Sequence, residues 1–156
     1  MSWKESEVVD CPAPRGGAQA RLEPVDTVTW GPAKADWTFC FYALSLDGKA
    51  LDGLYTRDFL WSEDGRRLAA VECLNPVQGS DFWNYTKPDW QPQQALMIVD
   101  IQRRAIGRAA AQADCFYKPK AFEADAIVYE KRKHFAIGPV RKMEVAISAI
   151  EDWRAL

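Results

Sequence analysis

Residues 59–107 contain the two apolar runs that decide the fold, RLAAVECL at 67–74 and ALMIVDI at 95–101. Nearly every residue in both runs is apolar, a pattern typical of strands that are buried on both faces. The first run follows FLW at 59–61 and the turn SEDG at 62–65. Asp-Gly between hydrophobic runs favours a hairpin, because glycine accepts the positive φ that a tight turn needs. We therefore expect a covered antiparallel meander at the centre of the molecule.

The chain as a whole predicts a mainly β fold. Its 156 residues are enough for one domain with a core, and its seven Trp, seven Phe and five Tyr favour sheet over helix. We expect an antiparallel β-sandwich or a strongly bent sheet, with short helical turns only, at 109–113 and 151–156; an α+β fold is the alternative. Residues 1–35 contain four prolines and are expected to form an extended arm packed on a single antiparallel β domain, residues 36–156.

Other segments are assigned from their periodicity. Residues 37–45 are the first expected strand, and residues 140–150, in which apolar and polar residues alternate, are the last. Between them, the Lys-Pro-Lys sequence at 118–120 predicts a turn. A strand is expected over 122–130, followed by a basic bend at 131–133.

A short internal echo, S-x-D-G-[KR]-x-L, occurs at residues 45–51 and again at 62–68. The two copies lie too close together for a propeller or solenoid unit, so we expect the same turn chemistry to be used twice. The second copy resembles the strand-turn-strand piece of β-propeller blades, and residues 95–107 resemble the outer hairpin of such a blade. The resemblance implies one blade-like sheet over 59–107 inside another β fold, because no series of copies at roughly 40–50 residues follows.

The connection between the two apolar runs carries the candidate binding residues. The segment GSDFWNYTKPDWQP at 79–92 holds four aromatic side chains. Long loops in compact domains are functional or disordered, and aromatic residues disfavour disorder. Two interpretations stay open: a lid that caps the end of the sheet, or a partner-binding surface with interface hot spots of about 2 kcal/mol or more each. The candidate partner-binding residues are Asp81, Phe82, Trp83, Tyr85, Asp89 and Trp90.

The sequence contains no motif for catalysis, a metal or a cofactor. His134 is the single histidine, and Ser-His-Asp, Cys-His and metal-ligand clusters need histidine with fixed companions. The motifs H-E-x-x-H, G-x-S-x-G and G-x-x-x-x-G-K-[ST] do not occur. We therefore expect neither a cofactor nor a metal.

Carboxylates are the remaining candidates for chemistry. Asp47, Asp52 and Asp58 fail the spacing of a calcium loop and are expected in turns. A carboxylate pair for glycoside hydrolysis stays open, because it depends on a separation across a cleft. The candidate members of such a pair are Glu63, Asp64, Glu72 and Asp100.

The net charge, the N-terminal sequence and the cysteines limit which classes of partner and which location we expect. The net charge of −2 gives no global attraction to nucleic acid or to anionic membranes. No apolar run approaches the ~18 residues of a membrane span, and the N-terminus lacks a signal-peptide core, so we expect a cytoplasmic protein. Four separate cysteines form no C-x-x-C pair. Two of them, Cys40 and Cys73, lie in apolar runs where a free thiol behaves as a small hydrophobe.

In scale and style, this acidic, aromatic-rich domain without a catalytic motif resembles the small immunity proteins with which bacteria neutralise toxins or secreted effectors. The resemblance implies a non-catalytic protein whose partner is another protein, not nucleic acid or membrane, in an oligomeric state that stays open. Two alternatives are kept. One is a carrier of small apolar ligands in an aromatic-lined pocket, and the other is a carboxylate-dependent hydrolase.

Overall fold

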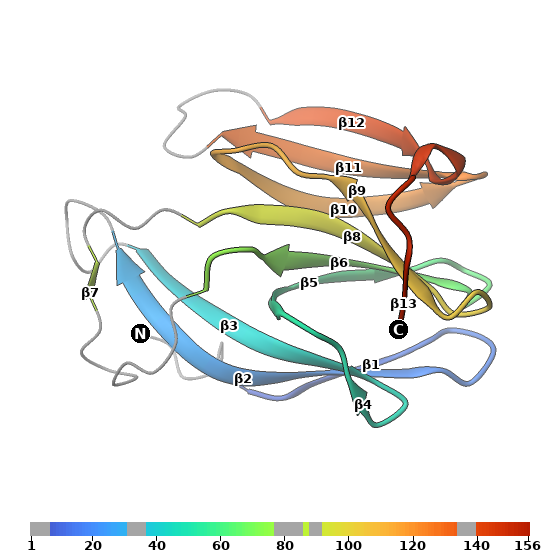
Figure 1. The fold of residues 1–156 in the computed structure, drawn as a ribbon, viewed down its shortest axis with the longest axis horizontal. Helices are drawn as coiled ribbons and strands as arrows, with labels where there is room; N and C mark the ends of the chain where they lie inside the picture. The colour runs from blue at the N-terminus through green and yellow to red at the C-terminus, as the bar shows by residue number, and fades with distance from the viewer. Residues whose placement is uncertain (1–6, 31–36, 77–85, 88–91, 134–139) are drawn as a thin grey trace.

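The computed structural model describes residues 7–30, 37–76, 86–87, 92–133 and 140–156, and Figure 1 shows their arrangement. In chain order the elements are β1 (Val9–Pro12), β2 (Gln19–Trp30), β3 (Trp37–Leu46), β4 (Lys49–Ala50), β5 (Leu54–Trp61), β6 (Arg67–Cys73), β7 (Thr86–Lys87), β8 (Gln94–Asp100), β9 (Ala105–Ala110), β10 (Cys115–Glu123), β11 (Ala126–Lys133), β12 (Arg141–Ala146), the 3-10 turn η2 (Ile147–Ala149) and β13 (Arg154–Ala155). The described residues contain no α-helix. The predicted mainly β, antiparallel fold is therefore confirmed, and the α+β alternative does not describe these residues.

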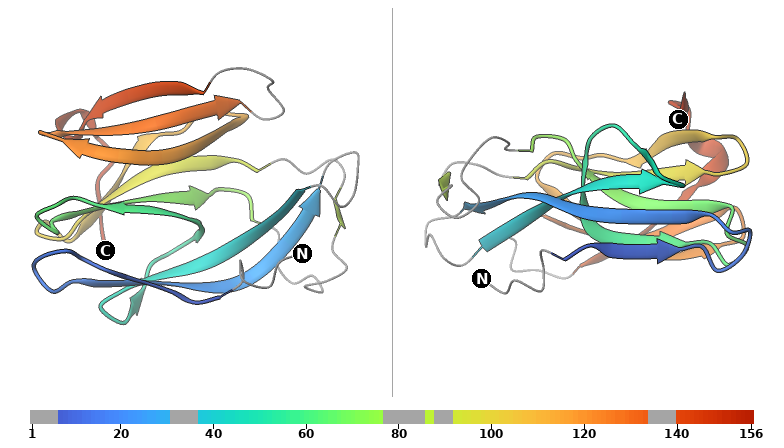
Figure 2. Two further views of the ribbon diagram at one scale, coloured as in Figure 1. Left: turned by 180° about the vertical axis from the view of Figure 1, so that it is seen from behind. Right: turned by 90° about the horizontal axis from the view of Figure 1, so that it is seen from below.

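The strands form three stacked layers, visible in Figure 1 and from behind in Figure 2. A ten-stranded sheet has the order β1-β2-β3-β5-β6-β8-β9-β13, with β4 beside β3 and β7 beside β2. A second sheet has the order β10-β11-β12. The large sheet bends between β3 and β5, which are joined by the single residue pair Tyr42–Tyr55. Its first part, β1 to β3, therefore lies across one face of the meander β5-β6-β8-β9.

The strands β6 and β8 form the middle layer and are buried on both faces. All seven residues of β8 are buried. On one face, Ala95, Met97 and Val99 pack in a cluster with residues of β1 to β3. On the other face, Leu96 and Ile98 pack with residues of β10 and β11. The doubly covered strand predicted from ALMIVDI is confirmed, and each such Leu or Ile side chain contributes about 1.5–3 kcal/mol by its burial.

Residues 7–30 contribute two strands to the large sheet. The hairpin β1–β2 continues the sheet, and β2 pairs with β3 with a register shift between Pro24 and Asp26. The Trp61 indole N–H donates a hydrogen bond to the Cys11 carbonyl oxygen at 2.8 Å, which ties this hairpin to β5. The division into an arm over 1–35 and a domain over 36–156 stays a prediction.

One end of the stack is fastened by Arg67, at the start of β6. Its Nη1 lies 2.9 Å from Asp125 Oδ1, in the turn between β10 and β11. Its Nε lies 3.8 Å from Oδ2 of the buried Asp100, at the end of β8. One guanidinium thus connects both sheets through their turns.

Turns predicted in the second half are wrong in position. Residues 118–120 lie inside β10, where the register shifts after Pro119. An edge strand tolerates this proline, and alternate burial along the first half of β10 outweighs the turn propensity of Lys-Pro-Lys. The turn instead follows Glu123, where Ala124 has a φ of 51°. Residues 131–133, predicted as a bend, continue β11.

Both predicted helical turns are wrong as well. Residues 109–113 begin as the end of β9, because the pairing with β8 continues to Ala110. Residues 151–156 include β13, which pairs with β9. The strand expected over 140–150 ends at Ala146, and the helical turn of this region is η2. Pairing with a neighbouring strand outweighs the helix propensity of alanine at the first of these sites.

The two copies of the S-x-D-G echo form turns of different geometry. Between β3 and β4, Asp47 and Gly48 have φ values of 50° and 82°, as a two-residue hairpin requires. Between β5 and β6, Gly65 has a φ of 72°, and Asp64 Oδ1 accepts a hydrogen bond from the Ser62 hydroxyl at 2.7 Å. The motif predicts the two turns correctly, but it does not predict one turn type.

The doubly covered position of β8 predicts the effect of shortening its side chains. Leu96 is fully buried, whereas Leu74, just after β6, is 40% exposed. We expect Leu96→Ala to lower the free energy of unfolding by about 2–5 kcal/mol, and Leu74→Ala to change it by less than about 1 kcal/mol. Urea unfolding followed by tryptophan fluorescence measures both. Equal losses would contradict the position assigned to β8.

The two echo glycines differ in what surrounds them. A Cβ at Gly65 would overlap the Arg15 carbonyl oxygen in the β1–β2 loop, whereas a Cβ at Gly48 would meet nothing within 4 Å. Both alanine variants carry the cost of a left-handed backbone, about 1–2 kcal/mol. We expect Gly65→Ala to lower the melting temperature clearly more than Gly48→Ala, measured by circular dichroism. Similar decreases would show that the β1–β2 hairpin does not pack against this turn.

Candidate functional site, a cleft between the two sheets

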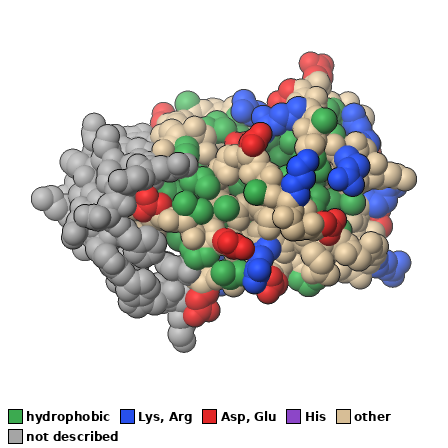
Figure 3. All heavy atoms as spheres, turned by 60° about the horizontal axis from the view of Figure 1, so that its bottom comes forward, with side chains coloured by type: hydrophobic (Ala, Val, Ile, Leu, Met, Phe, Trp, Pro, Cys, Tyr) green, Lys and Arg blue, Asp and Glu red, His purple; other side chains and the backbone are tan. Residues whose placement is uncertain are grey.

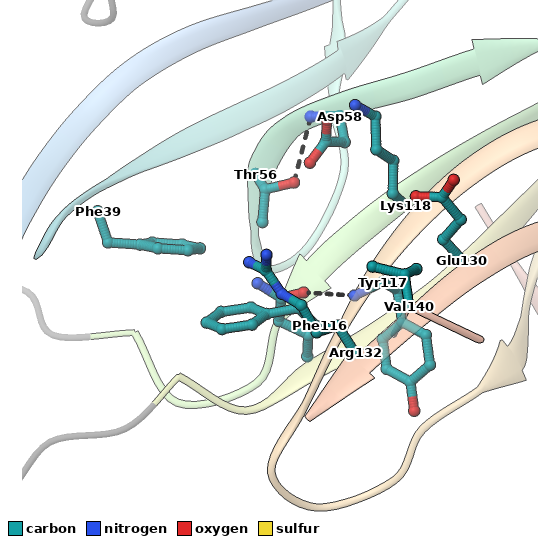
Figure 4. A pocket seen from close by; sticks show the side chains of 10 residues that line it. Phe39, Thr56, Asp58, Phe116, Tyr117, Lys118, Glu130, Arg132 and Val140 are labelled. Atoms are coloured by element: carbon teal, nitrogen blue, oxygen red, sulfur yellow. Dashed lines mark hydrogen bonds between the residues drawn. The ribbon is translucent and has the colours of Figure 1, made fainter. Parts of the chain in front are cut away.

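A cleft of about 430 Å³ opens between the large sheet and the three-stranded sheet (Figure 4). This volume falls within the range of about 300–1,000 Å³ that is typical of small-molecule sites. The strands β3, β5 and β8 form one wall, and β10 and β11 form the other. The lining residues are Phe39, Thr56, Asp58, Gln94, Phe116, Tyr117, Lys118, Glu130, Arg132 and Val140.

An irregular segment of β5 places two of the lining side chains. The register between β5 and β6 shifts between Tyr55 and Phe59, so that the three polar residues Thr56, Arg57 and Asp58 lie in a bulge. The Asp58 N–H donates to Thr56 Oγ1 at 3.2 Å, as the dashed line in Figure 4 shows. Bulges re-aim side chains and are frequent at functional sites. Asp58, predicted in a turn, is therefore held inside a strand at the cleft.

Two buried side chains in the cleft retain a hydrogen-bond donor. Gln94 is 4% exposed and Thr56 is 7% exposed. Gln94 Oε1 accepts a hydrogen bond from the Tyr117 N–H at 3.1 Å, which connects β8 to β10 and leaves Nε2 as the second polar atom of the amide. Thr56 Oγ1 already accepts from Asp58, which leaves the hydroxyl proton. Within the described part of the chain neither donor has an acceptor, and an unsatisfied buried donor costs about 1–3 kcal/mol.

Arg132 brings a guanidinium to the cleft from β11. Its guanidinium carbon lies 5.7 Å from the centroid of the Phe116 ring, a cation–π arrangement. No carboxylate among the described residues lies within ion-pair distance of it. Glu130, two residues earlier on β11, is 3.6 Å from Lys120 Nζ instead. The guanidinium therefore keeps its hydrogen-bonding edge available for another molecule.

The pKa values of Asp58, in the β5 bulge, and of Asp64, in the β5–β6 turn, are shifted in opposite directions. Partial removal of water by the surrounding protein raises the pKa of the Asp58 carboxyl, and the Lys118 ammonium counteracts this rise. Asp58 still reaches solvent, so it lies at the mouth of the cleft. The pKa of Asp64 is lowered because the Ser62 hydroxyl and the Arg66 N–H donate to its carboxylate.

The apolar part of the cleft comes from two aromatic rings, Phe39 on β3 and Phe116 on β10. They pack against the buried residues Phe41, Leu54 and Cys73. Burial raises the pKa of the Cys73 thiol to about 12, so this thiol is neutral at ordinary pH. All four cysteines are free, and Cys73 acts as the small hydrophobe that the sequence predicts. The Tyr117 ring points away from the other lining side chains in Figure 4, into the core between the sheets.

The residues predicted to bind a partner lie outside the described residues; they are Asp81, Phe82, Trp83, Tyr85, Asp89 and Trp90. His134 also lies outside them. The base of their loop is described. The Leu74 N–H donates to the Gln93 carbonyl oxygen at 2.7 Å, and the Gln93 N–H donates to Asn75 Oδ1 at 2.7 Å. The next residue, Gln94, lines the cleft. The described chain on the two sides of the predicted aromatic loop is therefore joined next to Gln94 of the cleft.

The carboxylates predicted as a hydrolytic pair do not line the cleft: Glu63, Asp64, Glu72 and Asp100. Asp100 is bound at the Arg67 end of the stack, and Asp64 lies in the β5–β6 turn. The carboxyl groups that do line the cleft are Asp58 and Glu130. The sequence predicts a site role for neither of them.

A second hollow lies on the outer face of β1 to β4. Figure 3 shows this face of the molecule, on which acidic and basic side chains are mixed. Arg21 lies 3.2 Å from Asp10 and 3.8 Å from Glu23, so the charges of this hollow pair with one another. It offers no buried polar group comparable to Gln94, and the cleft is the stronger candidate.

Searches against protein-family models, curated proteins and solved structures found no match. The resemblances to immunity proteins and to propeller blades therefore stay predictions. The described residues contain no group of three or more His, Cys, Asp or Glu arranged to hold a metal ion. None of their helical segments has the length and apolar character to cross a membrane.

Carboxyl titration provides a test of the cleft's electrostatics. In a ¹³C NMR titration we expect Asp58 to titrate above the ordinary range for aspartate and Asp64 below it. Lys118→Gln should raise the Asp58 pKa further, whereas Lys120→Gln should leave it unchanged.

A raised pKa means that the folded state holds the proton more tightly. The contribution of Asp58 to the free energy of unfolding is therefore fully present at a pH below its pKa in the unfolded chain. It is lost as the pH rises through its pKa in the folded protein. An Asp58 pKa at or below that of Asp64 would contradict this arrangement.

Proposed function

We propose that the chain is a non-catalytic binding protein and that the cleft forms part of its binding surface. The observation that carries this proposal is the Gln94 amide. Its oxygen is used by the fold, while its buried nitrogen has no acceptor among the described residues. Polar groups in protein interiors nearly always have a partner. A donor left open in a cavity of ligand size is therefore suited to a partner from outside the chain.

We propose another protein as the partner, as expected for an immunity protein that neutralises a toxin or effector. The described residues on the two sides of the predicted aromatic loop, Leu74 and Gln93, are hydrogen-bonded next to Gln94 of the cleft. Trp83 and Trp90 could then act together with Arg132 on one surface, and Trp, Tyr and Arg are the residue types enriched in interface hot spots. Four free thiols fit the reducing cytoplasm, which we propose as the location.

Tryptophan truncation tests the protein-binding proposal. We expect the tagged chain to capture a partner protein from its source cells, and Trp83→Ala and Trp90→Ala each to weaken the affinity about thirtyfold, equivalent to about 2 kcal/mol. Binding is measured by calorimetry with the captured protein, and stability by the melting temperature. Both variants should melt within a few degrees of the wild type.

The matched control is Trp61→Ala, because Trp61 packs against the core and donates to the Cys11 carbonyl oxygen. This variant should melt at a clearly lower temperature. If Trp83→Ala and Trp90→Ala destabilise the protein as much as Trp61→Ala and have no separate effect on binding, the loop is a lid. Co-expression of the captured protein with the wild type, but not with these variants, should restore growth if the function is neutralisation.

A small-ligand carrier is the second candidate function. The volume of the cleft and the exposed parts of Phe39 and Phe116 favour it. A carrier should respond to small molecules by a change in tryptophan fluorescence without any protein partner, whereas an immunity protein should respond to its protein partner alone.

A further inference from the structure

The cleft presents hydrogen-bond donors, a guanidinium without an ion-pair partner among the described residues, and two aromatic rings, and we propose that it binds a carboxylate carried on an aromatic body. The proposal rests on the binding function proposed above and names the chemistry that the cleft selects. Such a carboxylate can belong to a small aromatic acid or to the end of a protein chain. The experiment below separates these two sources.

The two leftover polar groups require acceptors from the ligand. The orientation of the Gln94 amide is fixed, because the Tyr117 N–H can be paired only with the amide oxygen. The Nε2 group therefore has to donate. The Thr56 hydroxyl oxygen already accepts from the Asp58 N–H, so its proton is also available for donation. Both side chains are more than nine-tenths buried and line the same cleft.

Two carboxylates and two cations line the cleft, so the preference for an anionic acceptor comes from how these charges are paired. The negative charge of Asp58 is opposed by Lys118, and that of Glu130 by Lys120. Arg132 adds a positive charge that no described carboxylate pairs with. A guanidinium presents two parallel N–H groups, and the two oxygens of a carboxylate can accept both of them at once.

The remaining walls favour a flat apolar body. Phe39 and Phe116 come from opposite sheets and belong to the same apolar cluster. In Figure 4, Thr56 and Asp58 lie on one side of the cleft, and Phe116 with Arg132 lies on the other. A ligand with a ring between the phenylalanines can place its carboxylate toward Arg132 and Gln94. Aromatic rings gain from offset or edge-to-face contact with such walls.

The test compares two probes that differ at one group, N-acetyl-phenylalanine and N-acetyl-phenylalanine amide. Titration into the ¹⁵N-labelled wild type, followed by NMR, measures both dissociation constants and locates the shifted amides. We expect the acid to bind at least tenfold more tightly than the amide and to shift the Tyr117 and Asp58 amide signals. A third probe, an N-acetylated tetrapeptide ending in phenylalanine with a free carboxylate, separates the sources. Tighter binding than the single residue indicates a protein chain end, and equal or weaker binding indicates a small acid.

Two neighbouring residues of β11 supply matched variants. Arg132→Gln and Lys133→Gln each remove one positive charge, but only Arg132 lines the cleft. We expect Arg132→Gln to weaken binding of the acid about tenfold and to leave the amide unchanged, whereas Lys133→Gln should leave both unchanged. Gln94→Glu keeps an acceptor for the Tyr117 N–H and removes the donor, so it should also weaken the acid. If Gln94→Glu fails to fold, the comparison of Arg132→Gln with Lys133→Gln still tests the proposal.

Three results would overturn the proposal: no binding of the acid at 10 mM to the folded wild type, equal binding of acid and amide, or equal effects of Arg132→Gln and Lys133→Gln. Failure of the binding function itself has a different signature. A wild type that captures a protein partner but binds no acid keeps the function and loses the carboxylate site. A chain that binds neither loses both.

Discussion

The whole architecture follows from a middle layer that needs a cover on each face. The strands β6 and β8 are apolar on both sides, so a single sheet cannot shield them from water. One cover is supplied by the same sheet, which turns back on itself after β3. The other is supplied by the separate sheet β10-β11-β12. Between β3 and β5 the backbone ladder is reduced to the pair Tyr42–Tyr55, and both tyrosines are buried where the sheet changes direction.

The cleft forms where the second cover is incomplete. At this end the β5 bulge turns Thr56 and Asp58 out of the regular ladder, and β10 approaches β8 through a side-chain hydrogen bond from the Tyr117 N–H to Gln94. A regular strand at this place would bring apolar side chains together and close the gap. The site is thus a local departure from the packing that stabilises the rest of the fold, with polar groups at the place where the two sheets separate.

The sequence predicts those parts of the fold and the site that depend on neighbouring residues, and it fails where residues far apart in the chain come into contact. ALMIVDI predicts a doubly buried strand because its own composition carries the information, and the two Asp-Gly turns follow from local backbone preferences. Lys-Pro-Lys and the alanine-rich run at 109–113 mislead, because pairing with distant strands overrides local propensity. Prediction of the cleft would require the knowledge that Gln94 contacts Tyr117, which lies 23 residues away in the sequence. One signal was available: Thr-Arg-Asp at 56–58 interrupts an otherwise apolar strand.

The two ends of the sheet pair are joined by different kinds of polar contact. At one end the Arg67 guanidinium joins Asp100 and Asp125 across both sheets. At the other, the described polar connection is the Gln94 amide oxygen with the Tyr117 N–H. The contact at the cleft end is made by a side chain that also lines the cleft, whereas the Arg67 contacts lie away from it. An occupant of the cleft therefore lies against the residue that joins the two sheets, so that ligand contact and sheet contact share the Gln94 amide.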